Sequence, residues 1–141
     1  MKAFFDTSVL VASARQADLR CEVSQRLLAQ FGPDEASCAG HTLAELYANL
    51  TGMRPPNRLR PEQAMIVLKQ LKSRLACVVL TPEELFETIQ RTASLSLAGG
   101  IVYDALLLGC ARKVNAERIY TWNLKHFQLV APDLADRIVT P

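Results

Sequence analysis

Asp104 is an acidic residue inside an otherwise apolar segment that runs from Ile101 to Ala111. The pattern predicts a helix that is apolar nearly all the way round, which is typical of a buried helix, and a buried carboxylate costs several kcal/mol unless a cation or hydrogen bonds compensate it. No Lys or Arg lies within one helical turn of it. We therefore expect Asp104 to need a partner from outside its helix, and a metal ion is a serious candidate.

Short apolar runs alternate with longer helical patterns along the whole chain. We predict strands at 2–5, 36–39, 76–80, 118–121 and 137–140, and helices at 8–15, 19–31, 42–53, 60–74, 81–97 and 100–115. The run at 76–80 is typical of a fully buried strand. The alternation indicates an α/β protein with a parallel sheet that carries helices on both faces.

Polar side chains follow two of the predicted strands. Asp6 and Ser8 come directly after the first strand, and Asn123 follows the strand that ends at Thr121. Ligands of parallel sheets bind at the carboxyl ends of the strands, so these groups and Asp104, in the first turn of its helix, are expected to converge there.

Each of these residues also has a structural interpretation. Asp6 and Ser8 can simply cap the first helix, and Asp104 can simply favour a helix N-terminus. Glu45 lies opposite the apolar face of its helix, which indicates a solvated side chain. The segment from Asn123 to Phe127 is typical of a turn closed by an aromatic residue, and neither histidine has the spacing of a metal ligand, so we read His41 and His126 as non-ligands.

The composition predicts one domain over residues 1–141, because 141 residues with 50% hydrophobic residues can bury a substantial core. No apolar run is long enough for a membrane span, and no leader pattern is present. The cysteines lack zinc-site spacing, and we expect all four to be buried, reduced thiols of a cytoplasmic protein. They are Cys21, Cys38, Cys77 and Cys110. The net charge of +2 does not decide between nucleic-acid binding and other functions.

Taken together and in order, these motifs resemble the PIN-domain nucleases, and more closely the toxins of VapBC-type toxin-antitoxin pairs. The resemblance covers essentially the whole chain. It is carried by Asp6-Thr7-Ser8-Val9-Leu10, by Glu45, by Gly100-Ile101-Val102-Tyr103-Asp104-Ala105 and by Thr121-Trp122-Asn123-Leu124-Lys125-His126-Phe127. It implies a Rossmann-like three-layer α/β/α sandwich with a mostly parallel central sheet.

The resemblance also implies a divalent metal site. Matched residue by residue, Asp6, Glu45 and Asp104 fall on acidic positions that bind Mg²⁺ or Mn²⁺, and Ser8 and Thr121 fall on supporting hydroxyl positions. Asn123 falls on a fourth acidic position, where many relatives carry aspartate. An amide oxygen brings no charge, so we expect a second metal to bind more weakly here.

The chemistry agrees with this interpretation, since carboxylate-bound divalent cations activate water and stabilise charge on a transferring phosphoryl group. The function expected is metal-dependent endoribonuclease activity, with RNA as substrate, and no residue resembles a protein nucleophile. Positive charge that could hold RNA occurs at Arg54, Arg58, Arg60 and Lys125. A merely solvated loop is the alternative for these residues. The resemblance further implies a homodimer that a small antitoxin protein neutralises.

Three other classes of protein remain open. An aspartyl phosphatase would place its nucleophile at Asp6, but that pattern calls for a second Asp where this chain has Ser8. A receiver domain would need paired acidic residues near the first loop, which are missing. A degenerate PIN fold that binds RNA or protein without cleaving it is compatible with Asn123.

Overall fold

The computed structural model describes all 141 residues and contains one five-stranded sheet in the order β3-β2-β1-β4-β5. Every neighbouring pair of strands is parallel, which confirms the predicted sheet. The strands are β1 (Ala3–Phe5), β2 (Ala36–Ala39), β3 (Ala76–Val78), β4 (Arg118–Tyr120) and β5 (Ile138–Val139). Parallel neighbours need long crossover connections, and helices supply them here.

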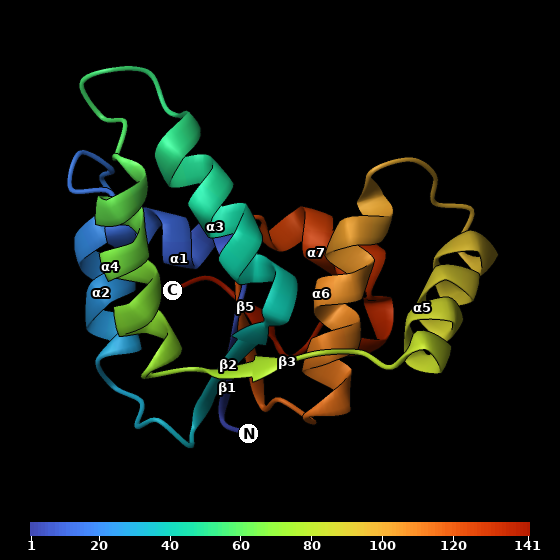
Figure 1. The fold of residues 1–141 in the computed structure, drawn as a ribbon. Coiled ribbons are helices and arrows are strands. Elements are labelled where there is room, and N and C mark those ends of the chain that lie inside the picture. The colour runs from blue at the N-terminus through green and yellow to red at the C-terminus, as the bar shows by residue number, and fades with distance from the viewer.

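Seven α-helices flank this sheet and complete a three-layer α/β/α arrangement (Figure 1). They are α1 (Thr7–Ala14), α2 (Cys21–Leu28), α3 (Gly40–Gly52), α4 (Pro61–Lys72), α5 (Pro82–Ser94), α6 (Ile101–Lys113) and α7 (Leu124–Val130). Helix α5 packs on α6, at the outer side of the molecule. A 3₁₀ turn, Pro132–Leu134, precedes β5. None of the helices is long and apolar enough to cross a membrane.

The two faces of the sheet bury two separate hydrophobic cores. Phe4 points into a core shared with α6 and α7, and Phe5 points into a core shared with α1, α3 and α4. Side chains of successive strand residues point to opposite faces, so one apolar dipeptide serves both layers. Each of these phenylalanines is 0% exposed.

The strand order places a topological switch between β1 and β4. The chain leaves the sheet on one side after β1 to form β2 and β3, and returns on the other side to form β4 and β5. In open parallel sheets, ligands bind in the crevice at such a point, outside the carboxyl ends of the strands. Asp6 follows β1 and Thr121 follows β4, so both lie at this position.

Three expectations about the elements were wrong. The 76–80 run is not a fully buried strand, because β3 is an edge strand of three residues, with Cys77 exposed and Val79 67% exposed. Cys77 is therefore not a buried thiol, unlike the other three cysteines. The residues after Asn123 form helix α7 rather than a turn, although Phe127 is buried as expected. Helix α2 begins after Leu19, which is fully exposed.

Candidate active site

Asp6 is a buried carboxylate, 3% exposed, that occupies the N-cap position of α1. Its side chain makes no capping hydrogen bond to the helix. It accepts hydrogen bonds from two hydroxyls, Ser8 Oγ at 2.5 Å and Thr121 Oγ1 at 2.8 Å, and both reach Oδ2. Asp6 therefore does more than cap a helix, because its carboxylate is oriented by side chains of two chain segments far apart in sequence.

Backbone groups fix those two hydroxyls in turn. The Trp122 amide donates to Ser8 Oγ at 3.0 Å, and the Asn123 amide donates to Thr121 Oγ1 at 3.0 Å. A hydroxyl that accepts one of these bonds directs its own proton to Asp6. The segment after β4 thus orients the carboxylate that follows β1, and Oδ1 of Asp6 receives no side-chain hydrogen bond.

Burial raises the pKa of the Asp6 carboxyl above its ordinary value. The hydrogen bonds from Ser8 and Thr121 lower this pKa, and the nearby charge of Asp104 raises it. No Lys, Arg or His forms an ion pair with Asp6. Its ionised form therefore lacks a compensating positive charge within the protein.

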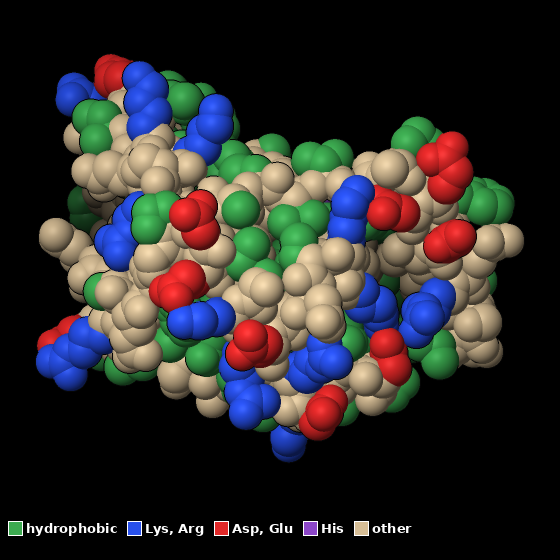
Figure 2. Space-filling model, turned by 90° about the horizontal axis from the view of Figure 1, so that it is seen from below, with side chains coloured by type: hydrophobic (Ala, Val, Ile, Leu, Met, Phe, Trp, Pro, Cys, Tyr) green, Lys and Arg blue, Asp and Glu red, His purple; other side chains and the backbone are tan.

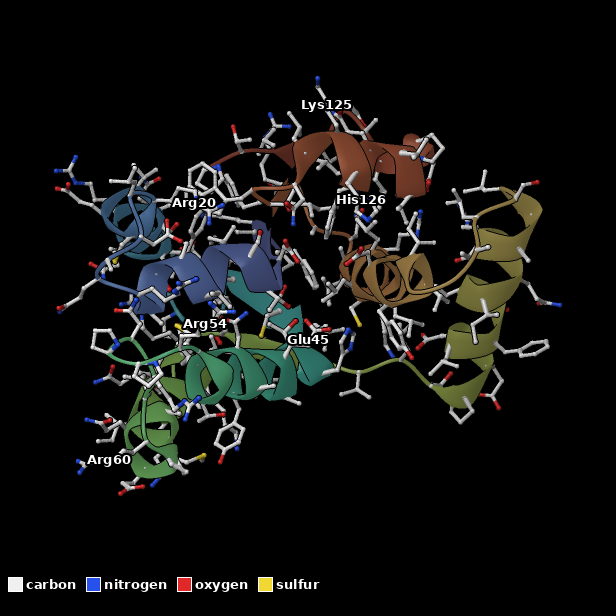
Figure 3. The ribbon with its side chains drawn as sticks, turned by 90° about the horizontal axis from the view of Figure 1, so that it is seen from above. Arg20, Glu45, Arg54, Arg60, Lys125 and His126 are labelled. Carbon is white, nitrogen blue, oxygen red and sulfur yellow. The ribbon has the colours of Figure 1, made fainter.

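Asp104 lies in the first turn of α6 and its side chain is 33% exposed, so the expectation of a fully buried carboxylate was wrong. The buried part of α6 begins one residue later, at Ala105. The partner that Asp104 required is His126, whose Nε2 lies 2.7 Å from Oδ2. Figure 3 shows His126 projecting from α7 toward α6. The spacing of His126 gave no signal for this contact, because the turn predicted there is a helix.

Glu45 is half-buried on α3 and accepts a hydrogen bond from the Thr7 hydroxyl. It lies near the centre of the view onto the carboxyl ends of the strands, between α1 and α6 (Figure 3). The helical period of α3 indicated a solvated side chain and missed this contact, because the period describes one helix and not the neighbour packed against it. Thr7 is a further residue of this region that the sequence did not single out.

The oxygen-rich chemistry of this region fits a hard divalent cation. Carboxylate, hydroxyl and amide oxygens are the groups such cations prefer. The charge of Asp104 already raises the pKa of Asp6. However, no three Asp, Glu, His or Cys side chains are gathered into a compact cluster. Glu45 and Asp104 each bond to a protein partner instead. Asn123 is exposed, and its side chain makes no capping bond to α7.

The four predicted RNA-binding cations do not form one cluster. Arg54 follows α3 in the α3–α4 connection, whereas Arg60 points outward at the start of α4 and Lys125 points outward from α7 (Figure 3). Arg60 Nε is 3.9 Å from the Glu62 carboxylate, and Arg58 Nε donates to the Met53 carbonyl at 2.8 Å.

Arg20 is a cation that the sequence did not single out. Its guanidinium lies 5.5 Å from the ring centroid of Trp122 and bonds to Asp18 through Nε and a terminal nitrogen, each at 3.0 Å. Figure 3 shows Arg20 on the same side of the molecule as Glu45 and His126. The opposite side, below the amino ends of the strands, carries Lys and Arg interspersed with Asp and Glu (Figure 2).

The chain is similar in sequence to known proteins. A family model described as the PIN domain matches residues 3–131. The Ribonuclease VapC27 of Mycobacterium tuberculosis is 35% identical over 92 residues, which cover 64% of this chain and 65% of that protein. The match thus spans slightly less than two thirds of that relative's length.

Solved structures share the fold at low sequence identity. Mycobacterium tuberculosis VapC20, described as a sarcin-ricin loop cleaving toxin, superposes with a TM-score of 0.67 at 19% identity, over 89% of this chain and 92% of that one. VapBC-1 from nontypeable Haemophilus influenzae superposes with a TM-score of 0.65 at 18% identity, over 94% of each chain. At this level of identity, the likeness concerns the fold.

Proposed function

Because this chain belongs to the PIN-domain family, we propose that it is a metal-dependent endoribonuclease that hydrolyses phosphodiester bonds in RNA. One observation carries the proposal. Asp6 is buried at the topological switch of the sheet, is oriented by Ser8 and Thr121, and has no cationic partner in the protein. A buried carboxylate in this situation is suited to a cation taken from solution.

We propose that Asp6, Asp104 and Glu45 hold Mg²⁺ or Mn²⁺. When bound, such a cation activates water and stabilises negative charge on the phosphoryl group. The hydroxyls of Ser8 and Thr121 keep Oδ2 of Asp6 in place, so that Oδ1 is available as a ligand. His126 plays the matching part for Asp104, because hydrogen bonds to ligating carboxylates fix their orientation.

The remaining polar groups have positioning roles in this proposal. Glu45 ligates the cation or orients the attacking water, and Thr7 holds its carboxylate. Asn123 stands at the fourth position of the site, where its amide oxygen can orient a water without adding charge. The attacking group is water, since no protein nucleophile is assigned a role.

For the substrate, we propose that cations at this edge of the sheet bind RNA phosphates. Arg54 is the first candidate, because it follows α3, the helix that carries Glu45, and forms no ion pair. Arg58, Arg60 and Lys125 would bind the RNA strand further out.

The comparisons support a biological setting. VapC27 carries the name ribonuclease, and the VapBC-1 structure shares this fold. We propose that this chain is the toxin of a toxin-antitoxin pair, that residues 1–141 act as one domain, and that the protein forms a homodimer and is neutralised by a small antitoxin protein.

A second candidate function is a PIN fold that binds RNA or protein without cleaving it. Two observations favour it: Asn123 brings no charge to the fourth position, and the carboxylates do not form a compact cluster.

Cleavage of labelled RNA by the purified protein separates the two candidates. We expect cleavage with Mg²⁺ or Mn²⁺, none in excess chelator, and almost none for Asp104→Asn in either metal. Asp34→Asn is the matched control, because Asp34 is an exposed carboxylate that precedes β2, at the other end of the strands. Metal-independent cleavage would contradict the proposed mechanism, whereas RNA binding without any cleavage would support the binding module.

A further inference from the structure

Cys38 on β2 and Cys77 on β3 are directly opposite each other in the sheet. The register pairs Cys38 with Cys77, between the pairs Ser37 with Ala76 and Ala39 with Val78. Neighbouring strands lie about 4.8 Å apart, which falls within the range of about 4.4–6.8 Å between the Cα atoms of a disulfide. The backbone therefore already holds the two cysteines at a separation that a disulfide can span.

The two thiols also share one face of the sheet. Ala39 and Val78 belong to the core on the α6 side, whereas Cys38 belongs to the opposite core. Since side chains alternate along a strand and paired residues of parallel strands point the same way, Cys77 faces the same side as Cys38. Burial raises the pKa of the Cys38 thiol, and the neighbouring Cys77 side chain raises it further, which is consistent with close contact.

The two cysteines differ in their access to solvent. Cys38 is 0% exposed, whereas Cys77 is exposed on an edge strand that has no neighbour beyond it. The remaining two cysteines are both buried. One of them, Cys110, directs its thiol to the Val78 carbonyl at 3.5 Å, on the other face of the sheet. An oxidant in solution therefore reaches Cys77 first, and the nearest partner for the product is Cys38.

We propose that Cys38 and Cys77 form an oxidation site at which a peroxide converts the two thiols into one cross-strand disulfide. The Cys77 thiolate attacks a peroxide oxygen, the O–O bond breaks, and Cys77 becomes a sulfenic acid as the first water leaves. Cys38 then attacks the sulfenic sulfur, the S–S bond forms, the S–O bond breaks and a second water leaves. The two thiols lose two electrons and two protons, and hydrogen peroxide is reduced to two waters.

This disulfide would enclose residues 38–77 in a covalent loop. The loop contains α3 and α4, and therefore Glu45 and the basic segment that includes Arg54. Oxidation would thus tie down the part of the chain that supplies one carboxylate of the proposed metal site. The oxidation itself does not depend on the proposed ribonuclease activity.

The test treats the full-length protein with hydrogen peroxide, blocks the remaining thiols under denaturing conditions and maps the peptides by mass spectrometry. We expect a monomer whose mass is lower by two hydrogen atoms, with Cys38 and Cys77 protected from blocking and released by dithiothreitol. The Cys110→Ser variant should give the same result, because Cys110 lies on the other face. The Cys77→Ser variant should form no disulfide.

Other outcomes would overturn the proposal. They are four blockable thiols after treatment, conversion of Cys77 to sulfinic acid in the wild type without a link, or a disulfide between Cys77 residues of two chains. In Cys38→Ala, the sulfenic acid on Cys77 should persist and be trapped by dimedone. If that variant does not fold, the peptide map of the wild type alone decides the question. No step of this test measures RNA cleavage. The disulfide proposal can therefore fail while the ribonuclease proposal holds, and the ribonuclease proposal can fail while the disulfide proposal holds.

Discussion

Asp6 and Asp133 are two carboxylates held in opposite ways. Asp133 lies in the 3₁₀ turn before β5 and bonds to Arg112 through both oxygens, at 2.9 and 2.7 Å, with Arg91 at 3.3 Å. Asp6 is buried, and the side chains that bond to it are neutral hydroxyls. Correspondingly, hydrogen bonding from Arg112 lowers the pKa of Asp133, whereas burial raises the pKa of Asp6.

The difference separates a structural carboxylate from one suited to a ligand. The charge of Asp133 is compensated by cations that the fold supplies, so nothing more is needed there. The charge of Asp6 has no compensating cation in the protein, and Asp6 lies at the topological switch, where parallel sheets bind their ligands. Asp104 is intermediate, because it is one third exposed and bonds to a histidine that is 42% exposed.

The sharpest test of this comparison replaces each aspartate by asparagine. We expect Asp6→Asn to lower RNA cleavage by at least about a hundredfold, because losing a ligand should cost no less than losing a group that merely supports one. Asp133→Asn should keep cleavage within about twofold of the wild type. The measurement is the single-turnover rate in Mn²⁺, with circular dichroism to establish that both variants fold. If both variants lost RNA cleavage equally, Asp6 could not be distinguished from Asp133 as the carboxylate suited to a ligand.

The comparison extends to cations. Arg112 is already paired with Asp133, whereas Arg54 and Arg58 form no ion pair and the Arg60 contact at 3.9 Å is weak. Replacing Arg54, Arg58 and Arg60 by Gln should weaken binding of all RNA sequences by a similar factor. The slope of log affinity against log salt should fall by up to about three units, or about one for each lost phosphate contact.

A matched control removes the same charge elsewhere. Lys69, Lys72 and Arg74 are exposed at the opposite end of the same connection, at and after the C-terminal end of α4. Their replacement by Gln should change the salt slope less than the loss of the three arginines. The same slope in both triple variants would assign the effect to net charge, and an unchanged slope in the arginine variant would exclude the loop from RNA binding.

Substitution of Asn123, the neutral residue at the fourth position of the proposed site, should change metal affinity by a smaller factor. Asn123→Asp adds a hard anionic oxygen at the fourth position of the proposed site, and each 1.4 kcal/mol gained in metal binding is about tenfold in affinity. We expect this variant to lower the Mn²⁺ concentration for half-maximal cleavage by up to about tenfold, and Asn123→Ala to raise it. Binding of Ca²⁺ followed by calorimetry checks the affinity without cleavage. Identical titrations for all three proteins would place Asn123 outside the metal site.

The sequence predicted the five strands and the first six helices in chain order, and it predicted that Asp6 and Ser8 meet the end of the strand that closes at Thr121. The reason is that hydrophobic periodicity locates strands, and the carboxyl ends of parallel strands share one edge. Neither rule says where a strand lies within its sheet. For that reason the apolar run that contains β3 was predicted to be buried, whereas β3 lies at the edge of the sheet and Cys77 is exposed.

The contacts of the other carboxylates could not be predicted in this way. His126 meets Asp104 because α7 packs beside α6, and Thr7 meets Glu45 because α1 packs beside α3. Such contacts depend on how pairs of helices are placed in space, whereas a periodic pattern describes the faces of a single helix.

The smallest expected effect is on stability, and its sign should differ between the two aspartates. In excess chelator at neutral pH, Asp6→Asn should leave the free energy of unfolding unchanged or raise it, because a buried charge without a partner is removed. Asp133→Asn should lower it by at most about 1 kcal/mol, since the ion pair is 42% exposed on the Asp133 side and solvent screens it. Urea unfolding measures both changes.

The pH dependence should separate the two aspartates further. The folded pKa of Asp133 lies below the ordinary value of 3.8, so its stabilisation is present above that pH and is lost as pH falls through the folded pKa. The folded pKa of Asp6 lies above 3.8, so its stabilisation is present below that pH and is lost as pH rises through the folded pKa. On acidification, the wild type should therefore lose its advantage in free energy of unfolding over Asp133→Asn. Over the same pH range it should lose any deficit in free energy of unfolding relative to Asp6→Asn. The two differences thus start with opposite signs, and both approach zero. If the difference in free energy of unfolding from the wild type has the same sign and the same pH dependence for both variants, the charge of Asp6 is compensated within the protein. The physical reason for placing a cation beside Asp6 would then be removed.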